Sequence, residues 1–105
     1  MDRYPILYID TEKLSNNSRI IRSFCNERGI NVASVIKGFN GIEKIVDTII
    51  NTGYKQIASS RLEHLKYVKI NWNDIETLSL RIPMISEIDE LIKWCDISLN
   101  SDLDI

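Results

Sequence analysis

The feature that most constrains the fold is a repeated succession of a strand-like segment and a helix-like segment. Four polar residues mark the ends of the strand-like segments, and their numbers differ by 23, 21 and 19: Lys37, Ser60, Arg81 and Asn100. A regular period of about twenty residues is typical of tandem βα units. Strands joined through helices pair in parallel, with right-handed crossovers. The spacing therefore predicts an α/β chain with a parallel sheet.

The predicted helices carry apolar residues at intervals of three and four, the period of a helix with one buried face. The clearest stripe consists of Ile42, Ile45, Val46, Ile49 and Ile50. We expect helices over 12–28, 42–52, 62–68 and 86–95, and strands over 4–9, 32–37, 56–59, 76–82 and 96–101.

Polar residues before the helices predict how these helices begin. Asp10 or Thr11 can cap the first helix. The pairs Asn40 with Glu43 and Ser60 with Glu63 match the spacing of capping boxes. His64, the only histidine, stands among charged residues of the third helix, and we expect it to face solvent and to take no part in catalysis.

The alternation within 76–82 distinguishes two kinds of α/β fold. A flat sheet covered by helices on both faces is apolar on both, whereas Thr77, Ser79 and Arg81 make one face polar. A barrel packs its outer face on helices and can be polar inside, near its C-terminal mouth. We therefore expect a partial (β/α)8 (TIM-type) barrel, about its first four βα units, with this polar face inward. Lys37, Arg81 and Asn100 then converge at one rim with the Ser59-Ser60 turn.

The composition of the 105-residue chain narrows the function classes and allows one domain. A net charge of -2 without a basic stripe argues against a nucleic-acid partner. Apolar runs of only a few residues, and a charged start without an apolar segment, argue against a membrane span and a signal peptide, so we expect a cytoplasmic protein. Cys25 and Cys95 fall at apolar helix positions without metal-ligand spacing; we expect buried free thiols and no metal site.

Several short segments carry a further signal through their order along the chain. They are Tyr4-Pro5 with Ile9-Asp10, Val35-Ile36-Lys37, Ala58-Ser59-Ser60-Arg61-Leu62-Glu63, Leu80-Arg81-Ile82-Pro83-Met84, Ser86-Glu87 and Asp96-Ile97-Ser98-Leu99-Asn100-Ser101. In this order they resemble the N-terminal part of the alanine and ornithine racemase family, whose members use pyridoxal 5'-phosphate on a (β/α)8 barrel. Where alanine racemases continue from the lysine toward a Tyr-Gly pair, this chain has Gly38-Phe39-Asn40-Gly41, which favours the ornithine type or another subfamily.

The resemblance implies an amino-acid racemase with an amino acid as its small-molecule substrate. Lys37 would hold the cofactor as a Schiff base and move the α-proton, while Arg81, Asn100 and Ser60 would contact the cofactor. Arg81 has an alternative role as one half of a structural ion pair, and Ser60 is first of all a helix cap. Because such a barrel takes about 250 residues, we expect 1–105 to be an N-terminal fragment, inactive alone, without the second catalytic group or the phosphate site.

Two other functions stay open at this point. The chain could be a non-catalytic barrel that carries pyridoxal 5'-phosphate, or a small α/β binding domain. Half a barrel leaves strand edges with unpaired backbone groups, so we also expect a homo-oligomer.

Overall fold

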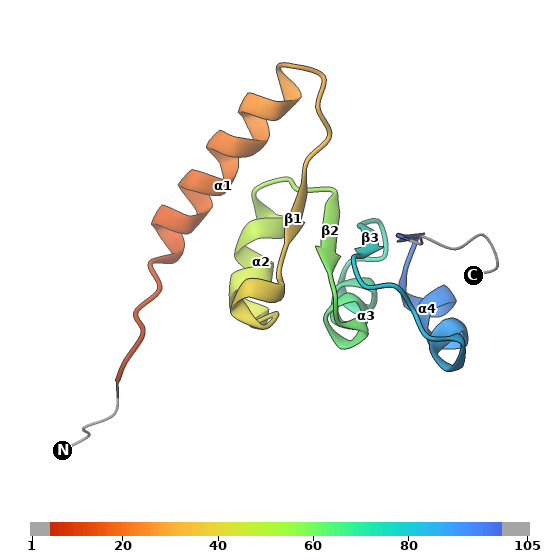
Figure 1. Cartoon of the computed structure of the whole chain (residues 1–105). Helices are drawn as coiled ribbons and strands as arrows, with labels where there is room; N and C mark the ends of the chain where they lie inside the picture. The colour runs from red at the N-terminus through yellow and green to blue at the C-terminus, as the bar shows by residue number, and fades with distance from the viewer. Residues whose placement is uncertain (1–4, 100–105) are drawn as a thin grey trace.

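The computed structural model describes residues 5–99 and has an α/β architecture in which helices alternate with parallel strands (Figure 1). The strands are β1 (Ala33–Val35), β2 (Gln56–Ser59), β3 (Glu76–Ser79) and β4 (Ile97–Ser98). The α-helices are α1 (Thr11–Asn26), α2 (Glu43–Asn51), α3 (Leu62–Asn71) and α4 (Ile88–Trp94), with 3-10 helices η1 (Lys37–Phe39) and η2 (Ile85–Glu87).

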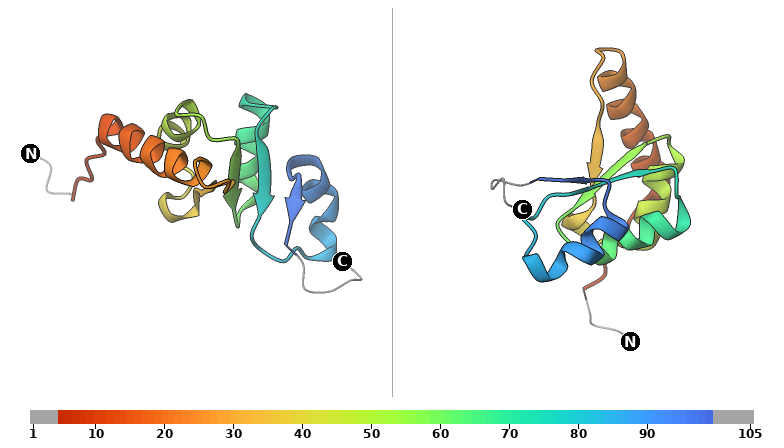
Figure 2. Two further views of the ribbon diagram at one scale, coloured as in Figure 1. Left: turned by 90° about the horizontal axis from the view of Figure 1, so that it is seen from above. Right: turned by 90° about the vertical axis from the view of Figure 1, so that its right-hand side faces the viewer.

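The four strands form one sheet in the order β1-β2-β3-β4, and each neighbouring pair is parallel. Sequential order with a helix in every connection is the arrangement of successive βα units, and α1 and α4 lie at opposite ends of the molecule (Figure 2). The prediction of an α/β chain with parallel strands is confirmed, and the arrangement is consistent with part of a βα barrel.

The core lies between the helices and one face of the sheet. Ile57 at the centre of β2 is 0% exposed, and it belongs to one apolar cluster with Val46 of α2 and Val68 of α3. The rest of the predicted α2 stripe is buried there too, apart from Ile42. Helix α1 packs on α2. The hydroxyl of Tyr54, which follows α2, donates to the backbone oxygen of Ser18 in α1 at 2.9 Å.

Several predicted element boundaries are wrong. Residues 5–10 form no strand, and their side chains are exposed without a neighbouring strand to pair with. β3 ends at Ser79 instead of residue 82, and α4 starts at Ile88 after the separate turn η2. β4 has the described bounds Ile97–Ser98, and the predicted continuation through Asn100 lies outside the described residues.

One of the three predicted helix caps is confirmed. Asp10 Oδ1 accepts hydrogen bonds from the backbone N–H groups of Glu12 and Lys13, each at 3.1 Å. The two predicted capping boxes are wrong: α2 and α3 begin after Ile42 and Arg61, neither of which caps its helix with a side chain. Asn40, at the first box position, belongs instead to a turn that is held by other contacts, described below.

The faces of the sheet are the reverse of the prediction. Thr77 and Ser79 are buried at 0% and 4% exposure on the side that the helices cover, and the Thr77 hydroxyl donates to the backbone oxygen of Trp94 in α4 at 2.8 Å. Val35, Ala58 and Leu78 are paired in register on the opposite face, where Val35 is exposed. The polar residues of β3 thus face the helices and do not line an inner chamber.

Other sequence expectations concern the cysteines and membrane association. Cys25 and Cys95 are free thiols, as predicted, but both are half-buried and not buried as expected. Within residues 5–99, the helices are too short or too polar to cross a membrane.

Candidate functional site

The carboxyl ends of β1, β2 and β3 meet at one edge of the sheet. Pairing continues past the strands through hydrogen bonds from Ile36 N to Ala58 O and from Leu80 N to Ser59 O, each at 3.0 Å. Lys37, Ser60 and Arg81 follow directly after these paired residues. The structure therefore brings these three predicted site residues to the same edge, while Asn100 lies outside the described residues.

Lys37 was predicted to end the strand, and this prediction is wrong: β1 ends at Val35, and Lys37 is the first residue of η1. Its backbone oxygen accepts from Asn40 N at 3.0 Å, and the oxygen of Ile36 accepts from Gly41 N at 2.9 Å, so the chain closes into a tight turn. Asn40 and Gly41 have φ angles of 55° and 61°, in the left-handed region. We call residues 37–41 the lysine turn.

The amine of Lys37 is available for chemistry. Its side chain is exposed, and within residues 5–99 it has no hydrogen bond or ion pair. A primary amine without a carboxylate partner can act as a nucleophile toward a carbonyl carbon once it has lost its proton. An exposed amine without a carboxylate partner within residues 5–99 thus lies at this edge of the sheet.

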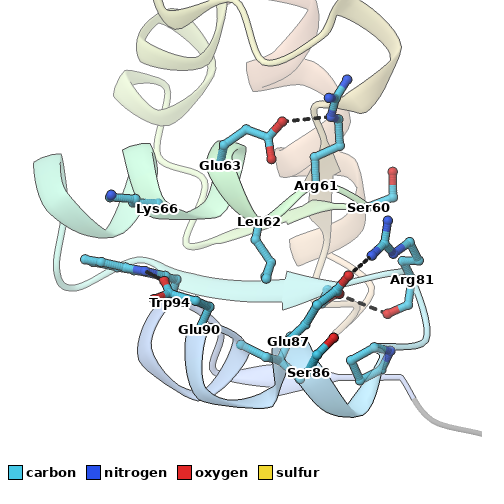
Figure 3. A pocket seen from close by; sticks show the side chains of 13 residues that line it. Ser60, Arg61, Leu62, Glu63, Lys66, Arg81, Ser86, Glu87, Glu90 and Trp94 are labelled. Atoms are coloured by element: carbon cyan, nitrogen blue, oxygen red, sulfur yellow. Dashed lines mark hydrogen bonds and ion pairs between the residues drawn. The ribbon is translucent and has the colours of Figure 1, made fainter.

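A cavity of about 520 Å³ lies beside the same edge, between α3 and the η2–α4 segment (Figure 3). Ser60 and Arg81 line it, whereas Lys37 does not. Arg81 points toward Glu87 of η2 and forms an ion pair with it (Figure 3). Two of the predicted cofactor contacts therefore line one cavity, and the predicted catalytic lysine is not part of its lining.

Arg61, another cation that lines the cavity, is also paired. Arg61 Nε lies 2.9 Å from Glu63 Oε1. A backbone hydrogen bond at the start of α3 lowers the pKa of Glu63, and Arg61 lowers it further, against a smaller opposing effect of burial. Both Arg61 and Arg81 thus have carboxylate partners, which reduces their availability for a phosphate group.

His64 was expected to face solvent, and that prediction is wrong. It is 7% exposed, and its Nδ1 lies 2.8 Å from the hydroxyl oxygen of Ser59. The spacing does contain the signal for this burial, because residues 64 and 68 lie one turn apart on the helix and Val68 is in the core. Ser60 does not cap α3; the backbone N–H of Arg61 donates to Ser59 Oγ at 3.2 Å instead.

Ser59 and His64 resemble a nucleophile and its base but cannot act as such on a dissolved substrate. Ser59 is 0% exposed, so its hydroxyl has no access to a substrate in this structure. Within the described residues, no three His, Cys, Asp or Glu side chains are grouped as metal ligands.

The fold and this edge define the class of protein: a chain of successive βα units, consistent with part of a βα barrel, with an unpaired lysine after the first strand of its sheet. No family model matches the sequence. Among characterised proteins, it is 36% identical over 103 residues to ornithine racemase from Acetoanaerobium sticklandii, covering 96% of this chain and 28% of the relative. It is also 28% identical over 102 residues to lysine racemase from Thermotoga maritima, covering 97% of this chain and 29% of that relative.

The chain is homologous to ornithine and lysine racemases of the alanine racemase family, which confirms the resemblance inferred from the sequence. It spans less than a third of the length of these relatives.

Proposed function

We propose that this chain contributes the lysine-bearing portion of an amino-acid racemase that uses pyridoxal 5'-phosphate, with Lys37 as the residue that holds the cofactor. The observation that carries the proposal is the position of Lys37 directly after β1, with an exposed amine that has no partner within residues 5–99, in a chain homologous to racemases. The names of the two relatives point to basic amino acids, ornithine or lysine, as the substrate class.

Pyridoxal 5'-phosphate, when bound, supplies a ring that accepts the electrons left behind when an amino acid loses its α-proton. Lys37 would hold the cofactor through Nζ, and the same amine would remove or return a proton at that atom. The lysine turn fixes the backbone position from which the Lys37 side chain extends, because hydrogen bonds from Asn40 N to Lys37 O and from Gly41 N to Ile36 O close the turn.

The other roles of a racemase are assigned differently. Arg61 and Arg81 are paired with Glu63 and Glu87, so we propose that the phosphate group is bound by residues other than these two arginines. We also propose that the acid on the opposite face of the substrate, which racemisation requires, comes from outside residues 5–99.

The test uses covalent trapping of the cofactor. The purified chain is incubated with pyridoxal 5'-phosphate and reduced with borohydride, and the modified lysine is identified by mass spectrometry. We expect the adduct on Lys37 and its loss in Lys37→Ala. Lys44→Ala, which removes another exposed lysine, is the matched control and should retain the adduct. An unchanged amount of adduct in Lys37→Ala would contradict the assignment.

Racemisation itself is measured on the intact racemase that contains this segment, by chiral chromatography of ornithine and lysine. Loss of both trapping and racemisation in Lys37→Ala supports the enzyme. Trapping at Lys37 without exchange of the α-proton in any amino acid tested would instead support a non-catalytic protein that carries pyridoxal 5'-phosphate.

A further inference from the structure

A buried histidine packs directly against the lysine turn. A Cβ built on Gly41 would lie 2.5 Å from Cδ2, 2.8 Å from Cγ and 2.9 Å from Nε2 of His64. The imidazole ring therefore covers the backbone of Gly41, with no room for a side chain at that position. This contact joins the lysine turn to α3, a helix that follows it by more than twenty residues along the chain.

The ring is held in this place from its other side. Ser59 Oγ accepts a hydrogen bond from Arg61 N at 3.2 Å and also forms a hydrogen bond with His64 Nδ1 at 2.8 Å, in which the donor depends on the tautomer of the ring. Ser59 is itself fixed as the last residue of β2, whose backbone oxygen accepts from Leu80 N.

A histidine that only filled space at this position would be less favourable for stability than an apolar residue. An apolar side chain of similar size would pack without needing a partner, whereas a buried imidazole must keep its hydrogen bond. The polar pair fixes the rotation of the ring, and a fixed ring defines where the backbone of Gly41 can lie. A second contact supports the same juxtaposition, since Arg61 Nη1 lies 3.5 Å from Asn40 Oδ1, at the long limit for a hydrogen bond.

We propose that His64 is a positioning residue for Lys37: the Ser59–His64 pair clamps the lysine turn onto the end of β2 and so sets the place of the Lys37 amine. Because the role of Lys37 rests on the proposed function, the test has one readout that involves the cofactor and one that does not. His64 contacts Gly41 and not the reacting amine, so it acts through the turn.

The variants separate the ring from its hydrogen bond. His64→Ala removes both, His64→Phe keeps a ring without a partner for Ser59, and His64→Asn keeps a polar atom near Ser59 without the ring over Gly41. Tyr67→Phe is the matched control: it lies on the same helix and loses one hydrogen bond, from its hydroxyl to Asp47 Oδ1 at 2.8 Å, away from the lysine turn. Thermal melts followed by circular dichroism identify any variant that fails to fold.

The first readout is amide hydrogen exchange at Asn40 and Gly41 in the full chain without cofactor. We expect faster exchange in His64→Ala and His64→Asn, in which the ring is missing, and exchange as in the parent in Tyr67→Phe. If both His64 variants are folded and protect these two amides as well as the parent does, the clamp does not exist and the inference is overturned.

The second readout is the rate at which pyridoxal 5'-phosphate and borohydride label Lys37, measured against labelling of exposed Lys13 of α1 in the same sample. We expect the ratio to fall about tenfold in His64→Ala, since small misplacements of a reacting group have effects of this order or larger. We expect partial rescue in His64→Phe and no change in Tyr67→Phe. A ratio in His64→Ala equal to that of the parent overturns the positioning role. A parent that does not favour Lys37 over Lys13 contradicts the proposed function instead, while the exchange readout still decides whether the clamp exists.

Discussion

Substitution of Gly41 by alanine tests the close contact between Gly41 and the ring of His64. The φ angle of 61° is left-handed, which costs a residue with a Cβ about 1–2 kcal/mol. The new methyl group would also overlap the ring of His64, at distances that no packed atoms tolerate, so the ring must move. Moving it off Ser59 leaves a buried polar group without its partner, at about 1–3 kcal/mol. We therefore expect Gly41→Ala to destabilise the fold by about 2–5 kcal/mol in total.

Gly29 provides a matched control for the backbone part of this effect. Its φ angle of 69° is almost the same, but a Cβ built there meets no atom within 4 Å. Gly29→Ala should cost only the backbone contribution, about 1–2 kcal/mol. For a domain of this size, each kcal/mol shifts the melting temperature by about 4–8 °C, so thermal melts of the two variants should be clearly separated.

The contact itself is isolated by combining Gly41→Ala with His64→Ala. Removing the ring should cost less in the Gly41→Ala background than in the parent, with a coupling free energy of about 0.5–3 kcal/mol, the range for residues in contact. Equal melting temperatures for Gly41→Ala and Gly29→Ala, together with no coupling in the double variant, would refute the packing of His64 over Gly41.

Four further predictions follow from other parts of the molecule. Ile57→Ala should destabilise the chain by about 2–5 kcal/mol in urea denaturation because Ile57 is fully buried at the centre of the core, and an unchanged midpoint would contradict this. The pKa of Asp96 is lowered because hydrogen bonds from Lys69 and the backbone of Thr77 outweigh its burial. Asp96 thus stabilises the fold above its unfolded pKa of about 4, and this contribution is lost as the pH falls through the lower folded pKa. Acid titrations should therefore show a weaker pH dependence of stability in Asp96→Asn than in the parent. The free energy of unfolding of Arg81→Lys should lie within about 1 kcal/mol of that of the parent, because an exposed ion pair contributes little to stability. A larger loss of stability would show that the planar guanidinium is required. Self-association remains a prediction, and sedimentation that is independent of concentration in the micromolar range would oppose it.

Much of the fold could be predicted because its signals are local. The stripe of α2 has a helical period that few other structures share, and four of its five residues are buried as expected. The bounds of β2 were predicted correctly, at Gln56–Ser59. Parallel pairing followed from the lengths of the connections, which contain helices and so rule out hairpins. These inferences needed no knowledge of contacts between distant residues.

The turn between β1 and α2 could not be predicted because asparagine serves two purposes. Asn40 stands three residues before Glu43, as in a capping box, but asparagine also tolerates the left-handed conformation. In the structure it adopts that conformation, with a φ angle of 55°, and the chain turns before α2 begins. Only the packing of His64 on Gly41 shows why the turn is favoured, and that contact joins residues far apart in the sequence.

The reversed faces of the sheet have a related cause, with a consequence for the search for function. Polarity in Thr77 and Ser79 suggested a wet inner face, but the Thr77 hydroxyl donates to the Trp94 backbone oxygen of α4. Ser59, which is paired with Ser79 in the sheet, likewise forms a hydrogen bond with the His64 ring of α3. A buried hydroxyl with such a partner costs little, so a polar strand residue can face a helix as well as a ligand chamber. The polar residues of β2 and β3 therefore fix α3 and α4 onto the sheet. Lys37 differs from them because it follows its strand, is exposed and has no partner within residues 5–99, which is why the functional proposal rests on it.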